Sequence, residues 1–207
     1  NLWTMNYIFN ENSIYDLDCD TCGEKGVMVM HADHIDYENA VADFITFEGA
    51  NILEIGYGMG LSATQIQANN PAKHIIIENH EKVYNNAVTW AEDKDNVEVI
   101  FGDYKEVIST LTDKFDGIYH SADKEAKGNL FNFRNDIKSL CNENCKLVML
   151  NWDINKDIFN KANYKEIQTS QTYKDTFGEL QTFIVYTTLI NNEWDKVDTD
   201  PIYTNLK

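Results

Sequence analysis

A glycine-rich turn between two differently patterned segments constrains this chain most. Residues Glu54 to Gly60 read EIGYGMG. The apolar run over 50–55 before the turn is typical of a buried strand, and the pattern over 61–68 after it is typical of a helix. Glycine has no Cβ, so the backbone can turn tightly and its amides can closely approach a ligand. The order of strand, turn and helix therefore predicts an α/β fold with a ligand-binding loop.

Strand-like and helix-like segments alternate along most of the chain. We expect further strands at 74–78, 97–101, 115–120 and 146–152, and helices at 31–47, 82–92, 104–111 and 130–140. Such alternation predicts a parallel sheet that is covered by helices on both faces. Two more strands, at 165–169 and 181–189, follow without a long helix between them and predict an antiparallel edge at the C-terminus. We therefore expect a Rossmann-like, doubly wound sheet of seven mostly parallel strands.

The organisation of the chain is that of one main domain. The sequence has only two prolines and no linker-like or repetitive segment. Residues 1–30 lack a clear period, so we predict an N-terminal extension that covers the cofactor site, with residues 31–207 forming the domain itself. The start lacks a secretion-signal pattern, and no apolar run is long enough to span a membrane, so we expect a cytoplasmic protein.

Charge and cysteine usage narrow the set of partners. The 207 residues include 17 Lys and Arg against 34 Asp and Glu, a formal net charge of −17. That balance argues against binding to nucleic acid phosphates or to an anionic membrane surface. The four cysteines, which are Cys19, Cys22, Cys141 and Cys145, form two pairs more than a hundred residues apart. We expect free thiols in a reducing compartment and no metal site.

Acidic residues near the turn indicate the class of ligand. Glu78 ends the second strand, where a carboxylate can accept both ribose hydroxyls of an adenosine. Asp103, after Gly102 at the end of the third strand, stands where it can meet the adenine amine. Glu54 directly precedes the first glycine and would repel a pyrophosphate but attract an ammonium or sulfonium group. We therefore predict S-adenosylmethionine as the cofactor in preference to NAD.

The amino-acid sequences of these segments are similar to those of one family. The stretches 52–60, 62–67, 74–79 and 115–118, together with Val27 to Met30 and Phe131 to Phe133, resemble guanidinoacetate N-methyltransferase and its bacterial relatives. These are cousins of the protein arginine methyltransferases within the class I S-adenosylmethionine-dependent group. The cofactor contacts that the resemblance implies are Glu54, Gly56, Tyr57, Gly58, Met59, Gly60, Glu78, Asn79, Gly102 and Asp103.

The sequence departs from the family where the substrate binds. The resemblance implies two acids that hold a guanidinium, yet Ser121 and His34 stand near those positions. We place Ser121 among the cofactor contacts, while Asp123, with Asp33 and Asp36, can supply displaced carboxylates. His120 is our candidate base because an unperturbed imidazole has a pKa of about 6.5. His34 and Asp123 are further candidates for the catalytic site.

These features predict an S-adenosylmethionine-dependent N-methyltransferase. Its acceptor is a guanidine, amine or amide nitrogen of a small molecule or peptide. An aminopropyltransferase using the decarboxylated cofactor remains an alternative, as does a non-catalytic interaction subunit that keeps the fold, and a Rossmann oxidoreductase is a more distant one. The sequence leaves the oligomeric state open, with a homodimer among the alternatives.

Overall fold

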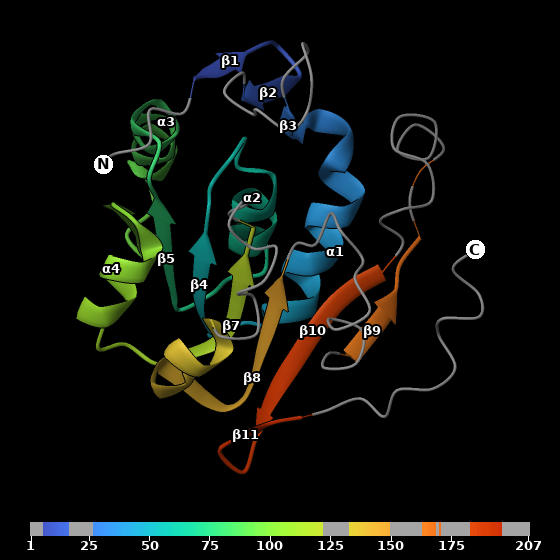
Figure 1. Cartoon of the computed structure of the whole chain (residues 1–207), viewed down its shortest axis with the longest axis vertical. Coiled ribbons are helices and arrows are strands. Elements are labelled where there is room, and N and C mark those ends of the chain that lie inside the picture. Colours follow the sequence, from blue (N-terminus) through green and yellow to red (C-terminus); the bar gives the residue numbers. More distant parts are fainter. Residues whose placement is uncertain are drawn as a thin grey trace.

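The chain folds around a mixed β-sheet whose central strands are parallel (Figure 1). The computed structural model describes residues 6–16, 27–121, 133–149, 163–168, 170 and 183–195. Seven strands cross the sheet in the order β11-β10-β8-β7-β4-β5-β6, and β9 pairs with β10 off this path. Their bounds are β4 (Asn51–Ile55), β5 (Lys73–Glu78), β6 (Val97–Phe101), β7 (Phe115–His120), β8 (Cys141–Met149), β9 (Asn163–Glu166), β10 (Phe183–Ile190) and β11 (Glu193–Trp194).

The direction of the strands confirms the predicted fold class. The five strands from β8 to β6 run parallel to one another. β10 is antiparallel to β8, and both β9 and β11 are antiparallel to β10. The sheet is therefore mostly parallel, with an antiparallel C-terminal edge. The carboxyl ends of β4, β5, β6 and β7 meet at one edge, which is where ligands bind in open sheets of this type.

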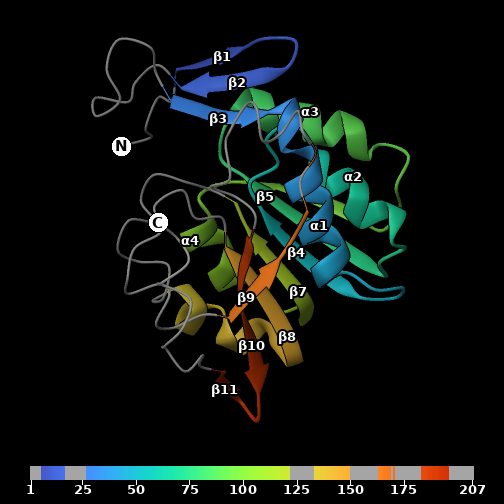
Figure 2. The ribbon, with the colours of Figure 1, turned by 90° about the vertical axis from the view of Figure 1, so that its right-hand side faces the viewer.

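Helices cover both faces of the sheet (Figure 2). On one face lie α1 (Ile35–Ile45), which follows η1 (Ala32–His34), α2 (Leu61–Ala68) and α3 (Glu81–Ala91). The other face is covered by α4 (Tyr104–Val107), η2 (Ile108–Thr110) and η3 (Lys138–Leu140), with a helical turn at 133–136. The side chains of each strand alternate between these layers, so Leu53 packs in the α4 layer and Ile52 in the α1 layer.

Several elements differ from the sequence prediction. Of the helix expected over 130–140, the described residues 133–140 form only a helical turn at 133–136 and then η3, and the strand expected over 165–169 ends at Glu166. The helix expected over 104–111 is α-helical only to Val107 and then tightens, since Ile108 to Thr110 are poor helix formers. β8 begins at Cys141, five residues before the expected start, because its polar segment pairs with β7 across a register shift. Asn144 takes a left-handed conformation there, with φ of 65°.

The N-terminal segment forms a small sheet of its own. β1 (Tyr7–Phe9), β2 (Ser13–Asp16) and β3 (Val27–His31) pair in an antiparallel order. This sheet lies above the carboxyl edge of the central strands (Figure 1). The ring of Tyr7 stacks on His80, with centroids 4.2 Å apart, and the ammonium of Lys82 lies 4.0 Å from the ring of Phe9. Both contacts attach the small sheet to the start of α3.

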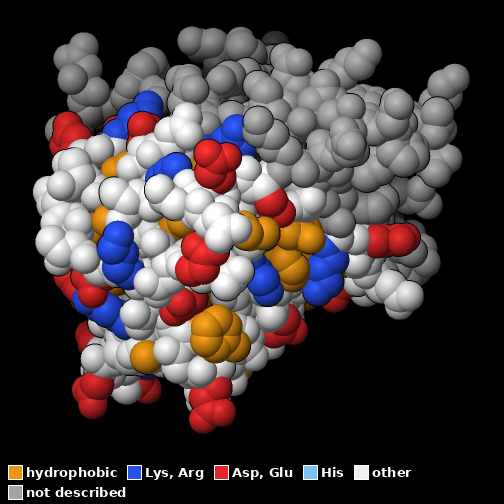
Figure 3. Space-filling view, turned by 90° about the horizontal axis from the view of Figure 1, so that it is seen from below, with side chains coloured by type: hydrophobic (Ala, Val, Ile, Leu, Met, Phe, Trp, Pro, Cys, Tyr) orange, Lys and Arg blue, Asp and Glu red, His pale blue; other side chains and the backbone are white. Residues whose placement is uncertain are grey.

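The opposite edge of the central sheet has the character of a solvated surface. Seen from below, acidic and basic side chains are interspersed with a few apolar ones over the described residues (Figure 3). Lys73 forms ion pairs there with Asp113 at 2.7 Å and with Glu98 at 3.8 Å. Among the helices in the described part of the chain, none is both long and apolar enough to cross a bilayer.

Candidate functional site

The glycine loop after β4 is packed so closely that a Cβ atom at Gly58 or Gly60 would collide with a neighbouring side chain. Gly58 has φ of 56°, and a Cβ built on it would lie 2.7 Å from the sulfur of Met30. A Cβ on Gly60, where φ is 74°, would collide with the ring of Tyr57. The glycines thus allow two side chains to pack directly on the loop. The amide of Met59 donates to the sulfur of Met30 over 3.1 Å.

The Glu78 carboxylate fastens this loop to the neighbouring strand. One oxygen accepts the amide of Tyr57 at 2.9 Å, and the other accepts those of Asn79 and His80 at 2.8 Å. Burial raises the pKa of Glu78, and the three amide hydrogen bonds oppose that shift. The residue is 7% exposed and stands at the carboxyl end of β5, as predicted from the sequence. Its role in binding a ribose stays a prediction.

Ser121 fastens the same loop from the other side. Its hydroxyl donates to the carbonyls of Ile55 at 3.0 Å and Gly56 at 3.2 Å, and its amide donates to the carbonyl of Ile55 at 2.9 Å. These bonds connect the end of β7 to the beginning of the glycine loop. The loop is therefore held by both neighbouring strands before a ligand arrives, which lowers the cost of ordering it on binding.

Other predicted cofactor residues lie along the same edge. Asn79 is exposed at the end of β5, and Gly102, with φ of 153°, follows β6. The amide of Gly102 donates to the carbonyl of Glu78 at 3.1 Å. Asp103 is exposed and caps α4, because its carboxylate accepts the amide of Lys105 at 2.8 Å. The fold thus brings the predicted ribose and adenine residues together.

Glu54 is not placed as the sequence argument assumed. We expected its carboxylate at the mouth of the loop, but the residue is 0% exposed and points into the layer of α1 and α2. One oxygen accepts the hydroxyl of Ser62, and the other lies 3.0 Å from Nε2 of His74. The expected direct attraction of a cation at the mouth is therefore wrong. Strand alternation is the reason, since residue 54 faces the same layer as Ile52.

A buried polar cluster surrounds Glu54 and was missed in the sequence. Glu38 of α1 accepts the hydroxyl of Tyr119 at 3.2 Å. Burial, with the charge of Glu54, raises the pKa of Glu38 to about 8. Burial likewise raises the pKa of Tyr119. A glutamate on the buried face of α1, at position 38 between Tyr37 and Val41, was the signal that could have revealed this cluster.

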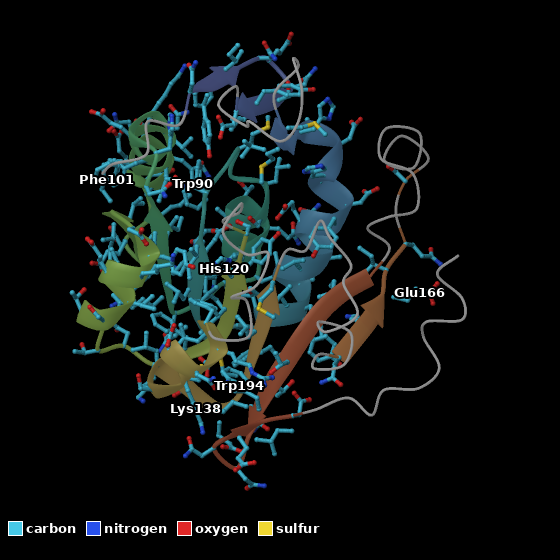
Figure 4. All side chains as sticks on the ribbon, viewed as in Figure 1. Trp90, Phe101, His120, Lys138, Glu166 and Trp194 are labelled. Carbon is cyan, nitrogen blue, oxygen red and sulfur yellow. The ribbon has the colours of Figure 1, made fainter. Side chains whose placement is uncertain are left out.

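His120 lies at the carboxyl end of β7, near the middle of the sheet (Figure 4). Tyr104 and Phe133 pack against its ring in edge-to-face geometry, at 4.8 Å and 4.5 Å. The residue is 3% exposed, and within the described ranges neither ring nitrogen has a hydrogen-bond partner. Burial lowers the pKa of His120 to about 4, so its imidazole is neutral and weakly basic at pH 7.

His34 occupies the turn before α1 and is also buried. Burial and the neighbouring His31 lower the pKa of His34 to about 4, although Asp33 opposes the shift. The third candidate catalytic residue, Asp123, lies outside the described residues. His34 and His120 therefore enter the site as neutral groups near pH 7, and their catalytic roles stay predictions.

The described cysteines are packed in the core. Cys141 and Cys145 are free and buried, while Cys19 and Cys22 lie outside the described residues. The thiol of Cys141 donates to the carbonyl of Ile137 at 3.4 Å. In the ranges that the structure describes, no three His, Cys, Asp or Glu side chains are grouped to hold a metal ion.

Comparison with solved structures identifies the class of fold. An O-methyltransferase from Bacillus cereus, solved in complex with SAH, aligns with a TM-score of 0.56 at 17% identity, covering 73% of this chain and 80% of that chain. The sheet order and the loop after β4 thus define a methyltransferase-type α/β fold.

The sequence comparisons then give the family. Residues 10–181 match the family model of guanidinoacetate N-methyltransferase, and the chain belongs to that family. Protein arginine N-methyltransferase 2 of Saccharomyces cerevisiae is 42% identical over 82 residues, covering 37% of this chain and 20% of that protein. The protein of the same name from Aspergillus oryzae is 25% identical over 203 residues, covering 93% of this chain and 46% of that protein. The chain spans less than half the length of these relatives.

Proposed function

We propose that this chain is an S-adenosylmethionine-dependent N-methyltransferase whose acceptor is a nitrogen of a small molecule or peptide. The observation that carries this proposal is the Glu78 carboxylate, which clamps the glycine loop at the carboxyl end of β5. The family match supports methyl transfer, and the names of the matched relatives support nitrogen as the acceptor atom.

The residues along the carboxyl edge fit this cofactor. Glu78 keeps acceptor capacity for the ribose hydroxyls, since each carboxylate oxygen has two lone pairs and three amide bonds do not fill them. Asn79 is exposed beside it and would join it at the ribose, and the exposed Asp103 would meet the adenine. The N-terminal sheet, through Met30, would cover the loop from above. When bound, the cofactor supplies a methyl group on a positively charged sulfur.

The protein's own contribution is mainly one of position. Holding two reactants in line supplies on the order of 7–11 kcal/mol of barrier reduction in favourable cases. The prearranged glycine loop, fixed by Glu78 and Ser121, is the part of the chain suited to this role. His120 is neutral and therefore able to accept a proton, but with a pKa of about 4 it is a weak base. We expect the acceptor nitrogen to arrive largely deprotonated or to lose its proton to water.

Binding and turnover test the proposal separately. Isothermal titration with S-adenosylhomocysteine should give saturable binding to the wild-type chain and at least tenfold weaker binding to Glu78→Gln. The exposed Glu48→Gln variant is the matched control and should bind like wild type. Incubation with S-adenosylmethionine and a panel of guanidines, amines and peptides should yield products heavier by one methylene. Absence of binding by the folded wild-type chain would refute the proposal.

A cofactor-binding subunit without turnover is a second candidate. One observation favours it: the Ser121 hydroxyl, near a position where the family resemblance implies a substrate-binding acid, donates to backbone carbonyls instead. Ligand binding together with no methylated product across the whole panel would decide for this second function.

A further inference from the structure

Two buried carboxyl groups lie next to each other beneath the glycine loop. Glu54 of β4 is paired in register with Tyr119 of β7, and the hydroxyl of Tyr119 reaches Glu38 of α1 at 3.2 Å, with both glutamates buried. Ser62, the second residue of α2, donates its hydroxyl to Glu54. The glycine loop therefore begins two residues after one member of this cluster and ends two residues before another.

The surroundings of the pair contain few compensating charges. Tyr119 of β7 donates to Glu38, and His74 of β5 lies 3.0 Å from Glu54. Behind His74, the Gln67 side chain of α2 is 3.3 Å from its second ring nitrogen. Among the described residues, none of the hydrogen bonds to the two carboxyls comes from Lys or Arg. His34 stands one turn before Glu38 on the same helical segment.

Ionising both carboxyl groups would cost free energy, because they are buried and close together. Burial and Glu54 raise the pKa of Glu38 to about 8, so Glu38 holds a proton at neutral pH. Within the described residues, its oxygen Oε2 is buried and has no hydrogen-bond partner. Glu38 is thus a group whose protonation responds to any charge that arrives on the loop above it.

We propose that the Glu38–Glu54 pair senses the charge of the ligand on the glycine loop, with Glu38 releasing its proton to water when a positively charged methyl donor binds. This inference rests on the proposed function, because it takes S-adenosylmethionine as the ligand. A nearby cation favours the charged form of a carboxyl, whereas the neutral demethylated product does not. By linkage, the affinity for S-adenosylmethionine rises with pH, whereas the affinity for the demethylated product does not. The Glu38–Glu54 pair therefore favours replacement of bound product by a new methyl donor.

Titration calorimetry in two buffers of different ionisation enthalpy tests this inference. At pH 7.0 the wild-type chain should release a measurable fraction of a proton on binding S-adenosylmethionine, and less on binding S-adenosylhomocysteine. The affinity for the donor should rise about sixfold between pH 6.5 and 8.5 if the pKa of Glu38 falls by one unit on binding. Glu38→Gln should abolish both effects, and the exposed Glu48→Gln should retain them.

A second variant keeps the test decisive if Glu38→Gln fails to fold. Tyr119→Phe removes a hydrogen bond that lowers the pKa of Glu38, so the pH dependence of donor affinity should move to higher pH. Equal proton release for both ligands in the wild-type chain would overturn the inference while leaving the proposed function standing. Failure of both ligands to bind the folded chain would overturn both.

Discussion

The carboxylate of Glu54 lies 3.0 Å from Nε2 of His74, and neither side chain has any exposed surface. The two residues belong to adjacent strands, β4 and β5, and His74 lies near the amino end of β5, where it pairs in register with Ile52. Trp90 of α3 packs against the His74 ring. The two rings meet edge to face, with their centroids 6.4 Å apart. The pair therefore ties the loop-bearing strand to its neighbour inside the sheet, below the carboxyl edge where the proposed ligand would bind.

Removing one member of this pair should be costly. His74→Leu leaves the buried Glu54 carboxylate with the hydroxyl of Ser62 but without the imidazole, and breaking a buried pair costs about 3–5 kcal/mol. We expect urea unfolding to show this loss, with a much smaller further loss on adding Glu54→Gln, because the amide needs no charged partner. If His74→Leu and Glu54→Gln were additive in a double-mutant cycle, the two side chains would not be coupled.

The stability of the chain should fall as pH rises from 4.5 to 8 because of Glu38. Its pKa is raised from 4.5 to about 8 by burial and by Glu54, so the folded state binds a proton that the unfolded state has lost. The stabilisation is complete below pH 4.5 and is lost as pH passes through the folded value. Denaturant unfolding of Glu38→Gln should show a flatter profile between pH 6.5 and 8 than wild type. Parallel profiles for the two proteins would contradict the assignment.

Two buried histidines should act in the opposite direction at lower pH. The pKa values of His34 and His120 are both lowered from 6.5 to about 4, chiefly by burial. The unfolded chain therefore binds protons that the folded chain does not, and stability falls as pH drops from 6.5 to 4. His120→Phe should remove part of this loss, seen as a smaller decrease in melting temperature between pH 7 and 5. An unchanged slope in the variant would count against this account.

The same lowered pKa makes a kinetic prediction. If His120 is the base, its deprotonated form persists down to about pH 4, so turnover should show no inflection near pH 6.5 from this residue. A rate profile measured with the identified acceptor, in wild type and in His120→Phe, checks this. An inflection near pH 6.5 that disappears in the variant would mean that the imidazole is hydrated during turnover.

Two glycine substitutions separate backbone strain from collision. Gly49 and Gly58 both have positive φ, at 82° and 56°, but only Gly58 would place a Cβ against Met30. Gly49→Ala should cost about 1–2 kcal/mol, the strain of a left-handed residue. Gly58→Ala should cost more and should weaken binding of S-adenosylhomocysteine, and Met30→Ala in the same chain should restore part of the stability. Equal losses for the two alanine variants would show that Met30 yields freely.

Much of the central sheet could be predicted from the sequence because its strands are short segments rich in β-branched and aromatic residues. The segments 97–101 and 115–120 fold with the expected bounds, as does the helix over 61–68. The N-terminal sheet was not foreseen, since β1 to β3 are short and gain their order from tertiary contacts such as Tyr7 on His80. Pairing also set the early start of β8, which its polar residues concealed.

The sequence predicted where the site residues lie along the strands better than it predicted the direction of their side chains. Spacing along the chain locates residues at strand ends, which is why Glu78 and Asp103 lie at the expected edge. Spacing does not show which way a side chain points, and Glu54 turned into the core rather than toward the loop mouth. The cluster of Glu38, Ser62 and His74 joins three elements, so the local pattern marks only Glu38, as a glutamate on the buried face of α1.

The contacts of Glu78 reach far beyond the ligand edge. Its carboxylate holds the amide of His80, and the ring of His80 carries Tyr7 of the N-terminal sheet. A nucleoside that hydrogen-bonds to this carboxylate is therefore connected, through His80, to Tyr7, which lies more than seventy positions earlier in the sequence. Deleting residues of β1 should therefore weaken the binding of the nucleoside without lowering the stability of the central sheet.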